Sequence, residues 1–335
     1  MLNPKRAAKA ILASRWGWAA TQALRPRGTA VLMYHRVSPL SDPFPTLDVE
    51  VFRAQMEWLK ARCRVIAPEE LRDTLARPSG ERSVLLTFDD GYKSYFDHVY
   101  PILRELQMPS LVFLSTAYLD DPARSFAWDT LHLATQRTTR REVRLPWGDE
   151  AVVSIPEAKG GARQRLYTTC RGHLKHLKEP AQSELTQRLL ERLGVTPRDL
   201  EVPRQVLCWD EVRATMPLTR YGGHTHTHPI MSQLDSAALE MEIRLCRDRI
   251  AQETGANPRF FAYPNGGAED FTEEAKGLLR SHGFDIAFSA IEGLAQPQPD
   301  WMMVERLPKG NDLLDLVWLV AALRRSSEAG TAHAM

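Results

Sequence analysis

Two adjacent carboxylates, Asp89 and Asp90, directly follow the short apolar stretch Ser83–Phe88 and precede Gly91. The composition of this stretch predicts a buried strand. Because consecutive strand residues point to opposite faces, both carboxylates can face one site only if the chain turns there, and Gly91 permits such a turn. The carboxyl end of a buried strand is where α/β proteins place their active sites. An ordinary polar Asp-Gly turn is the alternative interpretation.

Three histidines alternate with threonines in the stretch His224–Pro229. His224 and His228 are four positions apart, a spacing that suits two metal ligands on one helix face. Pro229 disfavours helical geometry at His228, so a strand end or turn is favoured. A catalytic zinc-type site needs about three protein ligands and an open position, which two histidines and one carboxylate would satisfy. A solvated histidine-rich loop without metal is the alternative.

The elements that must position these residues alternate between strands and helices. An alternation of this kind predicts a parallel sheet or barrel. The expected strands are 29–37, 64–67, 83–88, 109–116, 218–223, 260–263 and 285–289. Helices are expected between them, among them one from the N-cap Asp48, one carrying Tyr95 and Leu106 on its buried face, and one over 236–254 that stops at Gly255.

The alternation is interrupted in the middle of the chain. Residues 144–155 resemble a hairpin between polar helical segments, which predicts an insertion crossing the top of the core. The expected domain organisation is a basic N-terminal extension, a first barrel part, the insertion, a second barrel part and a tail, at 1–28, 29–118, 119–203, 204–323 and 324–335.

Composition limits the classes of partner. The 335 residues carry 43 basic and 42 acidic side chains, so no overall field favours nucleic acid. The four cysteines are far apart in sequence, which favours reduced thiols. Residues 1–28 make a poor signal peptide but could form a basic helix on a membrane surface, or a helical extension packed on the domain. No transmembrane helix is predicted, and a location in the cytoplasm or at its membrane face is expected.

Four segments together resemble a known family. TFDDG at 87–91, HTHTHP at 224–229 and FAYPNG at 261–266 are similar to three ordered motifs of the NodB-homology polysaccharide deacetylases, carbohydrate esterase family 4. VLMYHRV at 31–37 resembles the opening strand of many bacterial members. The resemblance covers about residues 29–322 apart from the insertion. It implies a distorted (β/α) barrel with fewer than eight repeats and metal-dependent hydrolysis of an N-acetyl amide on a hexosamine-containing glycan.

The resemblance also implies roles for individual residues. Asp89 resembles the general base, and the metal ligands would be Asp90, His224 and His228, with His226 pointing away. The backbone amide of Asn265 is placed like the oxyanion donor of the family.

Substrate contacts are expected from three further residues. Tyr263 could pack near the acetyl methyl, with a core aromatic as the alternative, and Pro264 adjoins it. Trp128 of the insertion could stack on a sugar face, although such residues also pack an insertion's own core.

Two departures from the family pattern affect the catalytic assignment. Many members carry Arg where this chain has Ala262, and many end with a Leu-x-His strand whose histidine is the general acid, whereas this chain has Glu305–Pro308. We therefore expect His35 to protonate the departing amine, since an imidazole has about the right pKa near neutrality. Arg306 is expected to replace the missing arginine by pairing with Asp89.

The leading hypothesis is a metal-dependent deacetylase of an N-acetylated polysaccharide or of its lipid-linked precursor. Zinc is the expected metal, with cobalt and nickel as alternatives. A second hypothesis is an amidohydrolase that acts on a small amide or cyclic ureide. A third is a metal- or glycan-binding protein with impaired catalysis.

Overall fold

The computed structural model describes residues 13–14, 17–18, 28–78, 81–121, 123–147, 152–155, 161–175, 177 and 180–321. Most of the expected N-terminal extension and all of the expected tail 324–335 lie outside these residues. The chain divides into two compact units. Among the described residues, the barrel unit joins those up to Leu40 with Thr46–Asp121 and with those from Val206 to Ala321. The helical unit joins Ser41–Pro45 with the described residues between 123 and Gln205.

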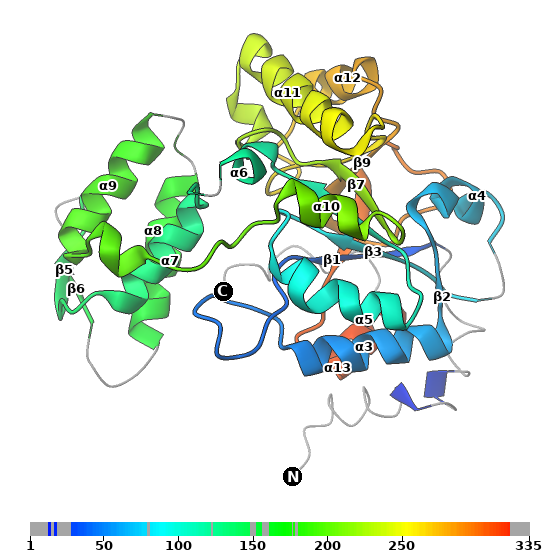
Figure 1. The fold of residues 1–335 in the computed structure, drawn as a ribbon, viewed down its shortest axis with the longest axis horizontal. Helices are drawn as coiled ribbons and strands as arrows, with labels where there is room; N and C mark the ends of the chain where they lie inside the picture. Colours follow the sequence, from blue (N-terminus) through cyan, green and yellow to red (C-terminus); the bar gives the residue numbers. More distant parts are fainter. Residues whose placement is uncertain are drawn as a thin grey trace. The chain divides into compact units, whose positions relative to one another are not determined.

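Parallel strands build the barrel unit (Figure 1). They are β1 (Ala30–Tyr34), β2 (Arg64–Val65), β3 (Ser83–Phe88), β4 (Ser110–Leu114), β7 (Thr219–Gly223), β8 (Phe260–Ala262), β9 (Ile286–Glu292) and β10 (Val304–Pro308). The order is β1-β10-β9-β8-β7-β4-β3, and β1 pairs with β3 over its whole length, which closes seven strands into a barrel. The short β2 adds to the start of β3. The predicted (β/α) barrel is thus confirmed.

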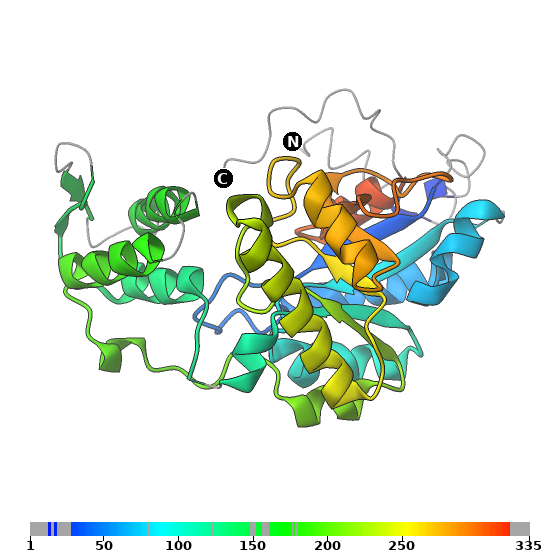
Figure 2. The ribbon, with the colours of Figure 1, turned by 90° about the horizontal axis from the view of Figure 1, so that it is seen from above.

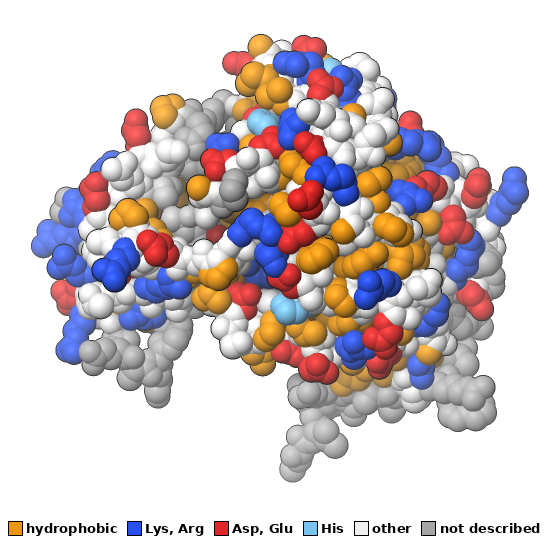
Figure 3. All heavy atoms as spheres, viewed as in Figure 1, with side chains coloured by type: hydrophobic (Ala, Val, Ile, Leu, Met, Phe, Trp, Pro, Cys, Tyr) orange, Lys and Arg blue, Asp and Glu red, His pale blue; other side chains and the backbone are white. Residues whose placement is uncertain are grey.

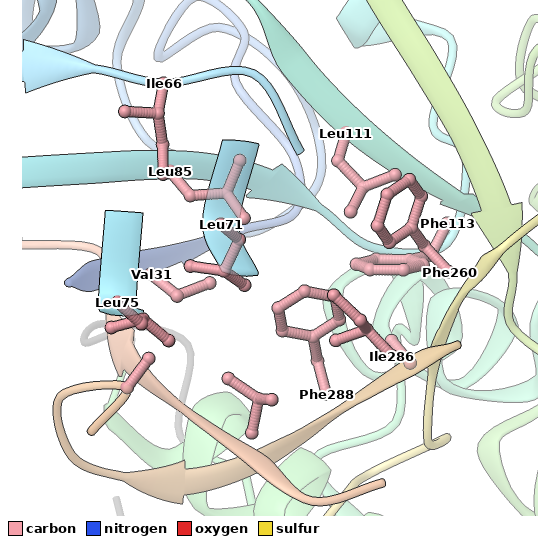
Figure 4. Packing of buried hydrophobic residues seen from close by; sticks show 13 residues of the cluster. Val31, Ile66, Leu71, Leu75, Leu85, Leu111, Phe113, Phe260, Ile286 and Phe288 are labelled. Carbon is pink, nitrogen blue, oxygen red and sulfur yellow. The ribbon is translucent and has the colours of Figure 1, made fainter. Parts of the chain in front are cut away.

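Apolar side chains from around the ring fill the interior of this barrel (Figure 4). Phe113 on β4 and Phe288 on β9 have ring centroids 5.5 Å apart, although two other strands separate β4 from β9 in the sheet order. The two rings therefore meet across the barrel. Leu71 and Leu75 of α4 (Leu71–Ala76) join the same cluster. Burial of this many apolar side chains is the main stabilising contribution to the unit.

Helices follow most of the strands. Besides α4 they are α3 (Val49–Arg62), α5 (Tyr100–Glu105), α6 (Thr116–Asp120), α10 (Trp209–Thr215), α11 (Ser236–Thr254), α12 (Glu273–Ser281) and α13 (Leu313–Ala321). The bounds of α11 and its end at Gly255, which has φ 75°, agree with the sequence prediction, and Asp235 caps the start by accepting a hydrogen bond from the Ala238 amide. In both ribbon views α11 and α12 lie side by side (Figures 1 and 2).

The helix expected after Gly91 begins differently from the prediction. Residues Tyr95–Val99 form a π-helical turn in which the Tyr100 amide donates to the Tyr95 carbonyl, five residues earlier, and α5 follows. Pro101 has no N–H to donate to the Asp97 carbonyl, which favours the wider turn.

The described residues of the N-terminal extension contact α3. Trp18 is buried against Trp58 with ring centroids 4.8 Å apart, and its indole N–H donates to the Arg62 carbonyl. This contact agrees with the packed-extension alternative, while membrane contact stays a prediction. Within the described chain, no helix combines the length and apolarity needed to cross a bilayer. Acidic and basic side chains are interspersed on the described surface seen in Figure 3, as the balanced composition predicts.

The helical unit has a core of its own. It contains α7 (Ala127–Arg137), the antiparallel pair β5 (Glu142–Arg144) and β6 (Val152–Ser154), α8 (Gly161–Lys175) and α9 (Ala181–Leu193). Leu166, Cys170 and Leu189 are among the buried residues that these elements enclose. The β5–β6 pair is the hairpin expected at 144–155, and the segment 148–151 between the two strands lies outside the described residues.

Candidate active site

The residues singled out in the sequence follow different strands of the barrel unit. His35 follows β1, Asp89 and Asp90 follow β3, His224 follows β7, and Asn265 follows β8 closely. Because these strands are parallel neighbours in a closed barrel, their carboxyl ends lie at the same end of it. The fold therefore collects these residues at the end where barrel enzymes carry out their chemistry.

The turn after β3 separates the two adjacent carboxylates. Asp90 and Gly91 both have left-handed backbone geometry, with φ 71° and 67°. A Cβ on Gly91 would come within 2.8 Å of the Leu114 side chain, so a larger residue would have to displace that side chain and adopt a left-handed backbone, which favours glycine. The amide of Asp89 still donates to the Tyr34 carbonyl of β1 at 2.9 Å. Asp89 therefore continues the strand while Asp90 is turned toward the histidines.

Asp90, His224 and His228 form a cluster in which the candidate ligand atoms all lie within 4.8 Å of one another; Asp90 and His224 are buried, and His228 is partly buried. Asp90 Oδ1 lies 3.4 Å from His224 Nε2 and 3.3 Å from His228 Nε2. Ligands at ordinary zinc distances in tetrahedral geometry are separated by about 3.4 Å. The three residues thus fit a divalent ion such as zinc.

The hydrogen bonds of the histidines agree with this assignment. His224 Nδ1 lies 2.7 Å from the Ala262 carbonyl, so the N–H is on Nδ1 and Nε2 is left to bind a metal. His226, by contrast, has its Nδ1 2.8 Å from the Thr116 hydroxyl. The structure places His226 away from the cluster, as the sequence analysis expected.

Electrostatics favour the ionised form of Asp90. Burial raises the pKa of this carboxyl, but the hydrogen bonds with His224 and His228 outweigh burial and hold the pKa well below its usual range. For His228, burial outweighs the hydrogen bond with Asp90, so the pKa of its imidazole is lowered. For His224, burial lowers the pKa, but the hydrogen bond with Asp90 and the charges of Asp89 and Asp90 outweigh burial and raise it. A metal binds the neutral imidazole, so binding at Nε2 of His224 would release the proton that this atom shares with Asp90.

Asp89 is paired with Arg306 inside the barrel. The guanidinium donates from Nη1 to Oδ1 at 2.7 Å and from Nη2 to Oδ2 at 2.8 Å, and both side chains are buried. Arg306 is itself held by the Ser289 carbonyl at 2.7 Å and the Thr87 hydroxyl at 3.3 Å. The pair with Asp89 was predicted from the sequence, but these two supporting contacts were not, because no local sequence pattern indicates them.

This pairing favours the ionised form of the Asp89 carboxylate. Burial raises its pKa, but the charge of Arg306, followed by His35 and His224, outweighs burial and keeps the pKa below the usual range. A carboxylate oxygen has two lone-pair positions, so each oxygen can accept a further proton or hydrogen bond while the arginine is bound.

His35 lies beside this pair. Its Nε2 is 3.9 Å from Asp89 Oδ2, and its side chain is 43% exposed whereas that of Asp89 is 4% exposed. An imidazole at the opening of a buried carboxylate site can exchange protons with solvent and with a bound molecule. The geometry thus brings the proposed acid and the proposed base next to each other.

The motif after β8 forms a tight turn. Asn265 has φ 59°, is exposed, and precedes Gly266, whose carbonyl accepts from the Ala290 amide at 2.8 Å. Pro264 is buried just before it. Tyr263 lies in a core cluster, stacked on Phe271 at 3.9 Å, with its hydroxyl donating to the Met302 carbonyl. This position matches the core-aromatic alternative for Tyr263.

Two aromatic residues of the expected insertion belong to the helical unit. Trp128 stacks on Phe126 with ring centroids 4.4 Å apart. Trp147 contacts His173 at 4.3 Å between ring centroids. Sugar stacking by Trp128 stays a prediction.

A closed (β/α) barrel with a metal-ligand cluster and a separate arginine-bound carboxylate at its carboxyl end has the arrangement of a hydrolase site. The family model described as polysaccharide deacetylase matches residues 76–144 and 210–287. This match confirms the resemblance to the polysaccharide deacetylase family that the motifs predicted. Members of the family are metal-dependent hydrolases that act on carbon–nitrogen bonds other than peptide bonds.

Curated relatives are similar to part of the chain. The YxkH protein of Bacillus subtilis is 32% identical over 100 residues, which cover 29% of this chain and 34% of that protein. The poly-beta-1,6-N-acetyl-D-glucosamine N-deacetylase of Escherichia coli K12 is 28% identical over 109 residues, 31% of this chain and 16% of that enzyme. The chain thus matches about a third or less of the length of these relatives.

Solved structures show the same fold over most of the chain. The deacetylase PplD of Streptococcus pyogenes aligns with TM-score 0.58 and 14% identity, covering 88% of this chain and 99% of that one. IcaB of Ammonifex degensii aligns with TM-score 0.55 and 20% identity, covering 89% and 98%. At these identities the alignments establish the fold.

Proposed function

We propose that this protein removes N-acetyl groups from hexosamine residues of a polysaccharide or of its lipid-linked precursor. The observation that carries the proposal is that two distinct groups of residues lie at the same end of the barrel. One is the cluster of Asp90, His224 and His228, and the other is Asp89, bound by Arg306 and next to His35. The name of the Escherichia coli relative, a poly-beta-1,6-N-acetyl-D-glucosamine N-deacetylase, supports the choice of substrate.

The three-residue cluster would hold a divalent ion, with zinc as the first choice and cobalt or nickel as alternatives. Such an ion supplies a Lewis acid that polarises the acetyl carbonyl and favours deprotonation of a water molecule.

The protein's own residues supply the remaining steps. Asp89, ionised because Arg306 lowers its pKa, accepts a proton from the attacking water. The amide of Asn265 donates a hydrogen bond to the developing oxyanion. His35 donates a proton to the nitrogen as the carbon–nitrogen bond breaks, which yields acetate and the free amine of the sugar. The exposure of His35 allows it to be reprotonated from solvent.

Acetate release from β-1,6-linked N-acetylglucosamine oligomers tests the function. We expect release by the zinc-reconstituted protein and none by the His224→Ala/His228→Ala double variant. β-1,4-linked oligomers and small amides or cyclic ureides should be assayed in parallel. Hydrolysis of the small amides alone would favour the amidohydrolase hypothesis, and zinc binding without hydrolysis of any substrate would favour a binding protein.

Removal of metal should also lower stability. A ligand that binds only the folded state at 100 times its dissociation constant stabilises that state by about 2.7 kcal/mol. We therefore expect addition of zinc to chelator-treated protein to raise the melting temperature by several degrees. The double variant should show no such rise, and an equal rise in both proteins would contradict the assigned ligands.

Replacing His35 by alanine should lower turnover by about a hundredfold, because general acid catalysis contributes about that much or more. Zinc affinity and melting temperature should change little, since the side chain is half exposed and is not a ligand. In the wild-type protein, turnover should fall at alkaline pH because His35 loses the proton that it donates, and this fall should be absent from the variant. Wild-type turnover in the variant would exclude His35 as the acid.

A further inference from the structure

Helix α11 carries a carboxylate on its buried face. Glu242 lies among Leu239, Ile243 and Cys246 and is only 6% exposed. A buried carboxylate is costly unless hydrogen bonds satisfy it. An acidic residue within an apolar helical stripe is the sequence signal for such a residue, and Glu242 was not among the residues predicted from the sequence.

Within the described part of the chain, the hydrogen bonds of Glu242 all go to the loop between the two candidate metal histidines. Its Oε2 accepts from the backbone amides of His226 and Thr227, each at 2.8 Å. Its Oε1 accepts from the Thr227 hydroxyl at 2.6 Å. The carboxylate therefore binds the two residues in the middle of the segment from His224 to His228.

This loop has a backbone conformation that its residues disfavour. Thr225 has φ 60° and His228 has φ 64°. The left-handed region is rare for non-glycine residues and is an outlier for a β-branched one such as threonine. Such geometry persists only where surrounding contacts impose it. Besides Glu242, the Thr225 hydroxyl accepts from the His228 amide at 3.0 Å, and the His226 carbonyl accepts from the Ala117 amide at 2.9 Å.

We propose that Glu242 is a positioning residue that sets the affinity of the site for its divalent ion. By holding the middle of the loop, its carboxylate keeps the imidazoles of His224 and His228 both within 3.4 Å of Asp90. It acts through the loop and contacts none of the three ligand side chains in the described hydrogen bonds. The inference rests on the proposed function in one respect, that the cluster binds metal.

The test measures the zinc dissociation constant by competition with a chromophoric chelator. We expect Glu242→Ala to bind zinc about 10- to 100-fold more weakly, the range found when groups that orient metal ligands are removed. Glu242→Gln should recover most of the affinity. Its amide oxygen can accept both backbone N–H groups, and its amino group can donate to the Thr227 hydroxyl.

Ile243→Ala is the matched control, since Ile243 is the next residue of α11, is fully buried, and is held by apolar packing alone. It should lower the melting temperature without weakening zinc binding. Equal zinc affinity in Glu242→Ala and wild type would overturn the proposal, as would equal weakening in Ile243→Ala.

If Glu242→Ala does not fold, a less disruptive variant, Thr227→Val, can be used to test the proposal. Thr227→Val removes only the hydroxyl that donates to Glu242, and we expect it to weaken zinc binding a few-fold. Unchanged affinity there would overturn the proposal. Failure of the wild-type protein to bind zinc would overturn the metal centre and this inference together, whereas zinc binding that is insensitive to all of these variants would overturn only the inference.

Discussion

Replacing Asp89 by asparagine is expected to abolish acetate release, with turnover lowered about a thousandfold or more. General base catalysis contributes about 10²- to 10⁴-fold, and an amide at this position cannot accept the proton of the attacking water. The substitution keeps the size and shape of the side chain. Because Asp90, His224 and His228 are untouched, zinc affinity should stay close to that of the wild-type protein.

The comparison with Asp90→Asn separates the two adjacent carboxylates. That variant should lose most of its zinc affinity and hence its activity, whereas Asp89→Asn should lose activity with zinc bound. Acetate release should therefore be measured at matched metal content, together with the dissociation constant. Substantial turnover by zinc-loaded Asp89→Asn would show that another group is the base.

Replacing Arg306 by methionine is expected to have the largest effect on stability, a loss of about 3–5 kcal/mol in the free energy of unfolding, because removal of one partner leaves a buried charge unpaired. Arg306 and Asp89 are both almost fully buried and share two hydrogen bonds. Methionine has a similar length and fits the apolar surroundings, which include Phe113 below the guanidinium. Urea denaturation followed by circular dichroism would measure the change.

The stability deficit of Arg306→Met should depend on pH in a defined direction. Without the arginine, burial raises the pKa of Asp89, so protonation of the carboxyl at lower pH removes the unpaired charge. The deficit should therefore be largest at neutral pH and shrink as the pH falls. The double variant Asp89→Asn/Arg306→Met should recover much of the stability at neutral pH but none of the activity. A double variant as unstable as Arg306→Met would show that the arginine stabilises the barrel through its other contacts, with Ser289 and Thr87.

The sequence alone determined the class of fold and the end of the barrel that carries the site. Alternation of strands and helices requires parallel strands, and parallel strands bring their carboxyl ends together, so motifs at strand ends could be assigned to one site. Helix α11 was predicted to the residue because its apolar stripe and its C-terminal Gly255 act locally. The pairing of Arg306 with Asp89 was expected from the arginine missing at Ala262, although the two partners are 217 positions apart.

Tertiary structure alone decided the geometry of the site. Among the described residues five non-glycine residues have positive φ, and four of them are in the site motifs: Asp90, Thr225, His228 and Asn265. Local preference disfavours this backbone geometry, so only contacts from distant segments can hold it. Glu242 on α11, Ser289 on β9 and the closure of β1 onto β3 are such contacts, and none follows from the residues next to the motifs. Residue types and spacing therefore indicate which groups can do the chemistry, whereas the distances between them depend on packing between segments far apart in the chain.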